Sequence, residues 1–366
     1  MTTQSESTIQ TTAITGTTTD RPLFEVQTLF ESEPKSNVRI PKIIVTNDGT
    51  ILAFADCCRQ VRRSEDSGKT WHPNRETAPD VSGGAIVDET TGDVLLVCAR
   101  QGFLYRSQDD GVTWGKEQIV IRPNAAGYGT PEGVPASATC SESGITLQAG
   151  EHKGRLLMPV RIQPPEGNNA QEYWAYNYNT SIYSDDGGKS WQVSDPVQGG
   201  TGEGTLAELS DGRIYYNSRC HMAVDHRRYI AWSHDGGHRW VDWQSSDALF
   251  EIGEPFYFKY GSKPSYGCNA GLVRMPLETT GGKDVLLFST PDNPGGSRVR
   301  MTVWASFDGA TTWPVKRLVH AGPSAYSSLA ARPDGTILLL FEGGDTLYGN
   351  ITIARFNLAW LTAGAD

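Results

Sequence analysis

Long apolar runs, paired cysteines and clustered histidines are all missing from this 366-residue chain. Because no run of about 18 apolar residues occurs, we expect no membrane span. The six cysteines form no CxxC pair, and Cys57 and Cys58 are adjacent, so we expect free, mostly buried thiols rather than a disulfide framework. The seven histidines are scattered, so we expect no metal and no cofactor. No amphipathic helix of convincing length is predicted.

Charge is also scarce, because only 20% of the residues are charged and the formal net charge is −10. An acidic surface of this kind argues against nucleic acid or an anionic membrane as a partner. The first 20 residues are rich in Thr and Ser and contain no apolar core of a signal peptide. We therefore expect a disordered tail over residues 1–20, in a protein that is either cytoplasmic or secreted after processing.

Glycine and tryptophan, in contrast, are abundant, with 40 and 10 residues. An eight-residue phrase, Ser-x-Asp-x-Gly/Ala-x-Thr/Ser/Arg-Trp, is repeated through the chain, and we call each copy an Asp box. The five copies are Ser64–Trp71, Ser107–Trp114, Ser184–Trp191, Ser233–Trp240 and Ser306–Trp313. The aspartate can accept bonds from backbone N–H groups two residues on, and glycine tolerates positive φ, so each box predicts a tight turn. A repeated turn indicates one supersecondary unit used many times.

Two β-rich runs flank a short Asn, Asp or Gly turn at six places, which predicts six hairpins. They cover residues 43–54, 85–97, 144–160, 205–217, 270–289 and 328–341. Five are followed by an Asp box between further strands, and the sixth is expected to take its remaining strands from residues 350–361 and 23–30. Four-stranded units repeated six times predict an all-β fold, a six-bladed β-propeller. We expect one domain over residues 21–366.

Functional residue types lie at the ends of these hairpins, where a propeller gathers loops around its central channel. Arg39 precedes the first hairpin, Arg219 closes the fourth, and Arg298 precedes the strand that leads to the fifth box. Singly, each arginine is a common surface residue, but three from different blades could hold one carboxylate bidentately. Glu203 and Tyr326 enter the fourth and sixth hairpins. Tyr326 could be a core aromatic, or a phenol that a neighbouring carboxylate activates as a nucleophile.

The order of these motifs resembles the sialidase (neuraminidase) superfamily, in particular bacterial-type exo-sialidases. Asp boxes also occur in unrelated propellers, so the ordered set is the more specific signal. That set is Arg39-Ile40-Pro41, the five boxes, Glu203, Arg219, Arg298 and Tyr326 within Ala325–Leu329. The resemblance implies that the three arginines grip the sugar carboxylate, that Tyr326 is the nucleophile and that Glu203 activates it. It implies a sialylated or other acidic glycan as substrate, and release of a terminal nonulosonic (sialic) acid with retention. The tyrosine nucleophile is a known departure from the two-carboxylate scheme.

One part of the family pattern is missing. The family places a catalytic aspartate, the acid/base for the leaving oxygen, on a loop soon after the first hairpin. Here residues 54–61 run almost straight into the next strand. Asp56 lies just outside that position and Asp80 lies in a shortened loop of the second blade, so both are candidate replacements. Acid catalysis typically contributes about 10²–10⁴-fold, so we expect activity to depend on a good leaving group.

Two other functions remain open at this point. An arginine clamp with a tyrosine base could serve a lyase that cleaves beside a uronic acid, where the arginines would acidify the neighbouring C–H. A carbohydrate-binding propeller without catalysis would need the arginines but not an activated phenol.

Overall fold

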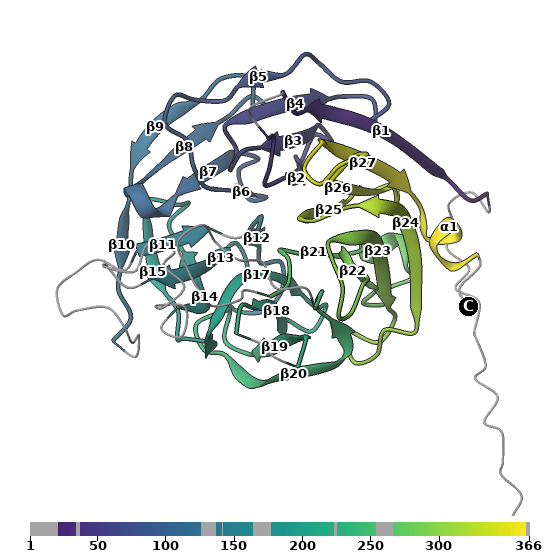
Figure 1. Ribbon diagram of the computed structural model, residues 1–366. Coiled ribbons are helices and arrows are strands. Elements are labelled where there is room, and N and C mark those ends of the chain that lie inside the picture. The colour runs from purple at the N-terminus through teal and green to yellow at the C-terminus, as the bar shows by residue number, and fades with distance from the viewer. Residues whose placement is uncertain are drawn as a thin grey trace, which may run out of the picture.

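The computed structural model describes residues 21–33, 37–125, 137–140, 142–163, 177–222, 225–253 and 266–363. The expected N-terminal tail, residues 1–20, lies outside the described residues. Six β-sheets stand around a common axis, with the first strand of each hairpin near the middle and the later strands at the rim (Figure 1). The fold is therefore an all-β propeller. A search of the described residues for a helix long and apolar enough to cross a membrane finds none.

Five of the sheets are regular blades of four antiparallel strands. The first contains β2 (Lys42–Val45), β3 (Ile51–Ala55), β4 (Gln60–Ser64) and β5 (Arg75–Glu76), and the second β6 (Gly84–Val87), β7 (Val94–Cys98), β8 (Phe103–Ser107) and β9 (Gly115–Gln118). Next along the chain is the blade of β17 (Thr201–Glu208), β18 (Ile214–Cys220), β19 (Arg227–Ser233) and β20 (Val241–Phe250). It is followed by the blade of β21 (Gly271–Arg274), β22 (Leu286–Pro291), β23 (Val299–Ser306) and β24 (Val315–Pro323).

The last regular blade joins the two ends of the chain. Its strands are β25 (Ser327–Ala331), β26 (Ile337–Gly343), β27 (Asn350–Phe356) and β1 (Phe24–Glu31). The pairing of β1 with β27 confirms that an early and a late segment complete the sixth hairpin. Residues 358–362, however, form the short helix α1 (Leu358–Thr362) and no strand, because the Asn357 side chain accepts the Trp360 N–H at 2.9 Å and caps the helix.

The remaining sheet corrects the prediction of six four-stranded units. It has seven strands: β10 (Val120–Arg122), β11 (Ser137–Cys140), β12 (Ile145–Thr146), β13 (Leu156–Gln163), β14 (Tyr178–Ser184), β15 (Ser190–Val193) and β16 (Gln198–Gly199). The outermost strand, β10, pairs with β15 in parallel, after the chain has left the preceding blade. Among the described residues, regular four-stranded blades thus number five, because one unit recruits extra strands from its flanking segments.

All six predicted hairpins are confirmed as antiparallel pairs of strands. In every regular blade the second strand is buried along its whole length, because neighbouring strands and neighbouring blades cover it on all sides. This explains why β3 and β7 read as continuous apolar runs, while the polar residues of β18 and β22 lie near the end of the propeller that holds the candidate site residues. All six cysteines are free, four of them buried and two half-buried, as expected.

The inner strands of neighbouring sheets contact one another in turn around the axis. Between them lies a cavity of about 320 Å³, whose lining includes Val45, Glu208, Arg274 and Ala331 at the far ends of the inner strands. The Asp boxes follow the third strands and so lie at this same end. The candidate site residues lie at the opposite end, where the inner strands begin.

Candidate functional site

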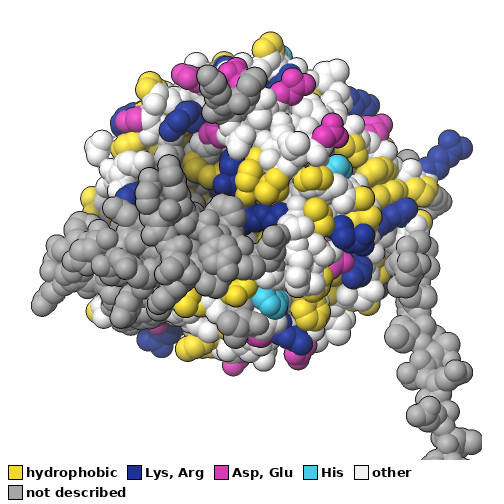
Figure 2. All heavy atoms as spheres, in the orientation of Figure 1, with side chains coloured by type: hydrophobic (Ala, Val, Ile, Leu, Met, Phe, Trp, Pro, Cys, Tyr) yellow, Lys and Arg dark blue, Asp and Glu magenta, His cyan; other side chains and the backbone are white. Residues whose placement is uncertain are grey.

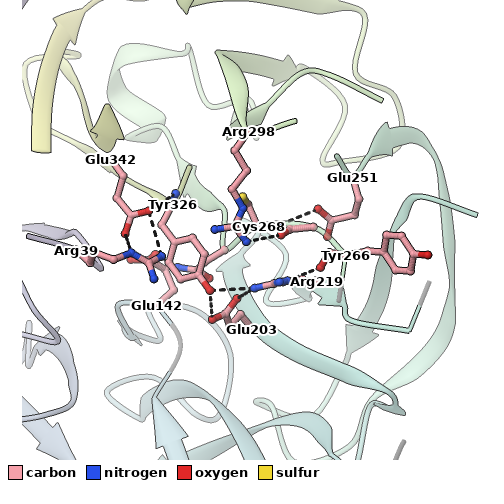
Figure 3. A network of polar contacts seen from close by, with 12 residues as sticks. Arg39, Glu142, Glu203, Arg219, Glu251, Tyr266, Cys268, Arg298, Tyr326 and Glu342 are labelled. Atoms are coloured by element: carbon pink, nitrogen blue, oxygen red, sulfur yellow. Dashed lines mark hydrogen bonds and ion pairs between the residues drawn. The ribbon is translucent and has the colours of Figure 1, made fainter. Parts of the chain in front are cut away.

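Five predicted residues meet at the end of the propeller where the inner strands start. Arg39 precedes β2, Tyr326 directly precedes β25, and Glu203 lies near the start of β17. Arg219 lies near the end of β18, which is antiparallel to β17 and therefore finishes at the same end. Arg298 directly precedes β23. In Figure 3 all five side chains point toward one region, and Figure 2 shows Lys and Arg side chains gathered near the middle of the face in view.

A tyrosine, a glutamate and an arginine form the centre of the site. The Tyr326 hydroxyl donates to Glu203 Oε1 at 2.5 Å, and Arg219 Nη1 donates to the same hydroxyl at 2.9 Å (Figure 3). Arg219 Nη1 also pairs with Glu203 Oε2 at 2.5 Å, and Arg219 Nε donates to the Tyr266 carbonyl. The Arg219 side chain is 3% exposed and that of Glu203 19%. The phenolic oxygen thus has a base on one side and a cation on the other.

Electrostatics sets the charge of this pair. Burial alone would raise the pKa of Glu203, but the positive charges of Arg219 and Arg161 hold it well below its usual range. Burial raises the pKa of Tyr326, and the Glu203 charge raises it further, although the three arginines act against this. At neutral pH the glutamate is therefore ionised and the phenol keeps its proton. The carboxylate can receive that proton only as the phenolic oxygen forms a new bond.

Glu203 lies between two glycines, Gly202 and Gly204, and its side chain faces the Tyr326 hydroxyl. The β17–β18 register shifts between Thr201 and Gly204, so Glu203 lies in a bulge that turns its side chain toward the axis. A side chain at Gly202 would collide with the His221 ring, since a Cβ there would lie 1.7 Å from His221 Nε2. The bulge therefore depends on glycine beside the glutamate.

Arg39 is held by a carboxylate that the sequence did not single out. Its Nε and Nη2 donate to the two oxygens of Glu342, at 3.0 and 3.3 Å. Glu342 is fully buried and also accepts the backbone N–H of Ile40 and of Tyr326. Ile40 has φ of +57°, which is unusual for a β-branched residue and turns its N–H toward Glu342. The one available signal was a single charged residue inside the apolar run of β26.

Arg298 completes the cluster from a third blade. It is 8% exposed, its Nη1 donates to the Tyr348 hydroxyl at 2.7 Å, and its Nη2 donates to the Gly267 carbonyl at 3.2 Å. All three arginines face the Tyr326 ring, with guanidinium carbons 5.0, 6.0 and 5.6 Å from its centroid for Arg39, Arg219 and Arg298. The three guanidinium groups therefore lie around one tyrosine ring.

The structure brings Asp56 beside Arg39, but gives its side chain structural partners. Its Oδ1 accepts the backbone N–H of Arg39 at 3.0 Å, and its Oδ2 accepts Gln60 Nε2 at 2.7 Å. Its own N–H donates to the Arg39 carbonyl at 2.6 Å. Asp56, Cys57 and Cys58 all have φ between +52° and +71°, so three left-handed residues make the tight connection between β3 and β4.

Asp80 is not brought to the arginines. It is exposed, and its two oxygens accept the Tyr105 hydroxyl and Lys116 Nζ, from the outer strands β8 and β9. The Lys116 and Tyr105 hydrogen bonds lower the pKa of Asp80, which favours the ionised form. Within the part of the chain that the structure describes, no bond joins Asp80 to Arg39, Arg219 or Arg298.

The fold and site together define a β-propeller with an arginine cluster around a tyrosine–glutamate pair. A family model described as a BNR repeat-like domain matches residues 98–339. The chain therefore belongs to that family, and its curated relatives place it in the sialidase superfamily. The "Sialidase" of Micromonospora viridifaciens is 31% identical over 93% of this chain and 55% of its own length. That of Clostridium perfringens is 27% identical over 72% of each chain. The chain thus spans about half of the Micromonospora relative.

Solved structures support the fold. The "Hadza microbial sialidase Hz136" has a TM-score of 0.68 and 24% identity, over 89% of this chain and 66% of that one. The intramolecular trans-sialidase from Ruminococcus gnavus, solved with oseltamivir carboxylate, has a TM-score of 0.69 and 16% identity, over 92% and 98%. At these identities the likeness concerns the propeller alone.

Proposed function

We propose that this protein is a retaining glycoside hydrolase of the exo-α-sialidase class, which releases a terminal sialic acid from a glycan. Arg39, Arg219 and Arg298 bind the sugar carboxylate, Tyr326 is the nucleophile and Glu203 its base. The observation that carries the proposal is the 2.5 Å hydrogen bond from the Tyr326 hydroxyl to an ionised, arginine-paired Glu203. The sialidase relatives support the same class.

A tyrosine suits a substrate whose anomeric carbon carries a carboxylate. An anionic nucleophile would be repelled there, whereas a neutral phenol approaches without that penalty. In the first step the phenolic oxygen bonds to the anomeric carbon, its proton passes to Glu203, and the bond to the leaving oxygen breaks. In the second step water attacks that carbon and gives up one proton to solvent, the bond from the carbon to the tyrosine oxygen breaks, and the protonated Glu203 returns its proton to restore the phenol. Two displacements at one carbon retain its configuration.

The leaving oxygen has no matching donor in this proposal. We infer that Asp56 serves as a backbone clamp for Arg39, and we assign no acid role to Asp80. Departure of the aglycone then relies on its own acidity or on water. We also propose that the seven-stranded sheet takes the place of a sixth blade, since its strands β12 and β13 contact the inner strands on both sides of it.

The decisive experiment compares aryl and sugar-linked sialosides with wild type, Tyr326→Phe and Tyr183→Phe. We expect wild type to cleave the aryl sialoside and Tyr326→Phe to lose at least about 10³-fold in kcat, because the nucleophile is gone. Tyr183 is a half-buried tyrosine of β14 whose hydroxyl contacts His238, so its variant controls for loss of a hydroxyl. An active Tyr326→Phe would contradict the proposed chemistry. Cleavage of a uronate polymer without cleavage of either sialoside would favour a lyase, and binding without turnover would favour a lectin.

A further inference from the structure

Tyr348 lies between two of the three arginines and touches each with a different part of its side chain. Its ring lies under the Arg39 guanidinium, whose carbon is 4.1 Å from the ring centroid. Its hydroxyl accepts Arg298 Nη1 at 2.7 Å. Arg39 precedes the first blade and Arg298 belongs to another, so one half-buried tyrosine from the β26–β27 loop connects two distant segments of the chain.

The loop that carries Tyr348 is fixed to the segment that carries Arg39. The Ser32 hydroxyl donates to the Tyr348 carbonyl at 2.7 Å and accepts the Val38 N–H at 2.9 Å. The Ser32 N–H donates to the Gly349 carbonyl. Tyr348 itself has φ of +65°, a left-handed conformation that costs free energy for a residue other than glycine. Strain of this kind persists where surrounding contacts enforce it, and it clusters at functional sites.

We propose that Tyr348 is a positioning residue that sets the spacing and orientation of Arg39 and Arg298 for one shared carboxylate. This inference rests on the proposed function of the arginine cluster. Arg39 is fixed at Nε and Nη2 by Glu342, and the Tyr348 ring supports the flat face of the same guanidinium. Arg298 is fixed at Nη1 by the Tyr348 hydroxyl and at Nη2 by Gly267. A planar guanidinium binds a carboxylate well only when its plane is set in advance.

The two parts of the side chain can be removed separately. Tyr348→Phe keeps the ring and removes the hydroxyl that holds Arg298, whereas Tyr348→Leu removes both. We expect Tyr348→Phe to raise KM for an aryl sialoside about tenfold with little change in kcat, since carboxylate binding is shared by ground and transition states. Tyr348→Leu should raise KM by a further two- to fivefold or so, through loss of the cation–π contact.

A second experiment separates the positioning role of Tyr348 from a general loss of structure in the variants. The probes are the 2,3-unsaturated glycal of N-acetylneuraminic acid and its methyl ester, titrated calorimetrically. We expect Tyr348→Phe to weaken binding of the acid about tenfold and of the ester by less than about twofold, because only the acid presents a charge to the arginines. Tyr183→Phe is the matched control, since Tyr183 also lies under an arginine, Arg155 at 4.1 Å, and also uses its hydroxyl.

Every outcome of these titrations either supports or overturns the positioning role of Tyr348. Selective loss of the acid supports the proposal. If Tyr348→Phe weakens binding of acid and ester equally, or of neither, the positioning role of Tyr348 is wrong. Binding of the acid by wild type would still support the proposed role of the arginines. If wild type itself does not bind the acid, the proposed function fails and this inference fails with it.

Discussion

At the scale of single residues, the site holds more positive than negative charge. Arg39 and Arg219 pair with Glu342 and Glu203, while Arg298 has the Tyr348 hydroxyl and a carbonyl among its partners. Taking these five ionisable groups alone, three cations face two carboxylates. A carboxylate ligand placed beside three guanidinium groups gains affinity from their charge and from their hydrogen-bond donors. This supports an anionic sugar over a neutral one.

The first prediction concerns Asp56. We expect Asp56→Asn to reduce kcat/KM by less than about tenfold, and by the same factor for aryl and sugar-linked sialosides, because the residue supports the Arg39 backbone. A general acid would behave differently, since its loss would cost about 10²–10⁴-fold on the poor leaving group and little on the good one. The measurement is kcat/KM on both substrates, with Asp80→Asn as the comparison. A selective loss in either variant would identify that aspartate as the general acid.

Sequence could predict residues of a reactive type that also lie in a recognisable motif. The five residues of this kind do meet in the structure: Arg39, Glu203, Arg219, Arg298 and Tyr326. It could not predict Glu342, because that glutamate becomes a partner of Arg39 only when β26 lies beside the start of β2, about 300 residues away by numbering. Tyr348 was missed for the same reason, since nothing in its local sequence distinguishes it from other loop tyrosines. The hydrogen bonds of Asp56 to the Arg39 N–H and to Gln60 depend on the left-handed turn, which the sequence does not predict either.

At the scale of elements, the Asp box is a self-contained hydrogen-bonded turn. In the second box Asp109 accepts the N–H groups of Val112 and Thr113 at 3.0 and 2.8 Å and the Thr113 hydroxyl at 2.6 Å. In other copies the tryptophan closes the turn, as when Trp191 Nε1 donates to the Gly188 carbonyl at 2.9 Å. The box therefore keeps its geometry in each blade whatever the adjoining loop, which is why the motif could be found by sequence alone.

A second prediction follows for the pH dependence of stability. Burial opposes ionisation of Asp109, but the hydrogen bonds from Thr113, Ser107 and Val112 together outweigh it and lower the pKa to about 2. A depressed folded-state pKa stabilises the fold above the unfolded value of about 3.9, and this stability is lost as the pH falls toward about 2. Asp109→Asn should therefore lower the melting temperature by about 2–4 °C at pH 7 and by much less near pH 2.5.

The control is Asp48→Asn, in the exposed β2–β3 turn. Thermal unfolding of wild type and both variants across this pH range makes the comparison. An Asp109→Asn deficit that stays constant with pH would mean that geometry, and not charge, stabilises the box.

The seven-stranded sheet contains strand pairings that the sequence could not predict. A hairpin is specified by a turn of a few residues, so all six were predictable. The parallel pairing of Val120 with Ser190 joins segments about 70 residues apart, and no local turn or periodicity specifies it. A count of repeats therefore gives the number of units, while the number of strands in a unit depends on which flanking segments find a free edge.

At the scale of the whole molecule, one strand closes the ring. β1 pairs along its length with β27, and the Leu23 N–H donates to the Asn357 side chain at 3.0 Å. Phe24 stacks on Trp360 of α1, with ring centroids 4.2 Å apart. From the other side, Arg62 of the first blade donates to the Leu29 carbonyl at 2.8 Å. β1 therefore joins the last blade to the first and covers an edge that would otherwise be open.

The third prediction tests this closure and its link to the site. A variant that starts at Ser32 should lose about 3–6 kcal/mol from the burial of Leu29 and Phe30 alone, which are 4% and 3% exposed. It should also aggregate, because β27 then presents unpaired backbone groups beside Ile351 and Ile353. Ser32, which connects the Tyr348 loop to the segment of Arg39, remains in this variant but becomes the chain terminus with no β1 to hold it in place. Binding of a carboxylate sugar should therefore weaken before global unfolding begins. A variant that starts at Arg21 keeps the whole strand and should match wild type. Urea unfolding and ligand titration of the same variants separate the two effects. A shortened chain that is fully stable would show that closure of the ring does not depend on β1. A shortened chain that is destabilised yet binds normally would show that the closing strand and the arginine cluster are independent.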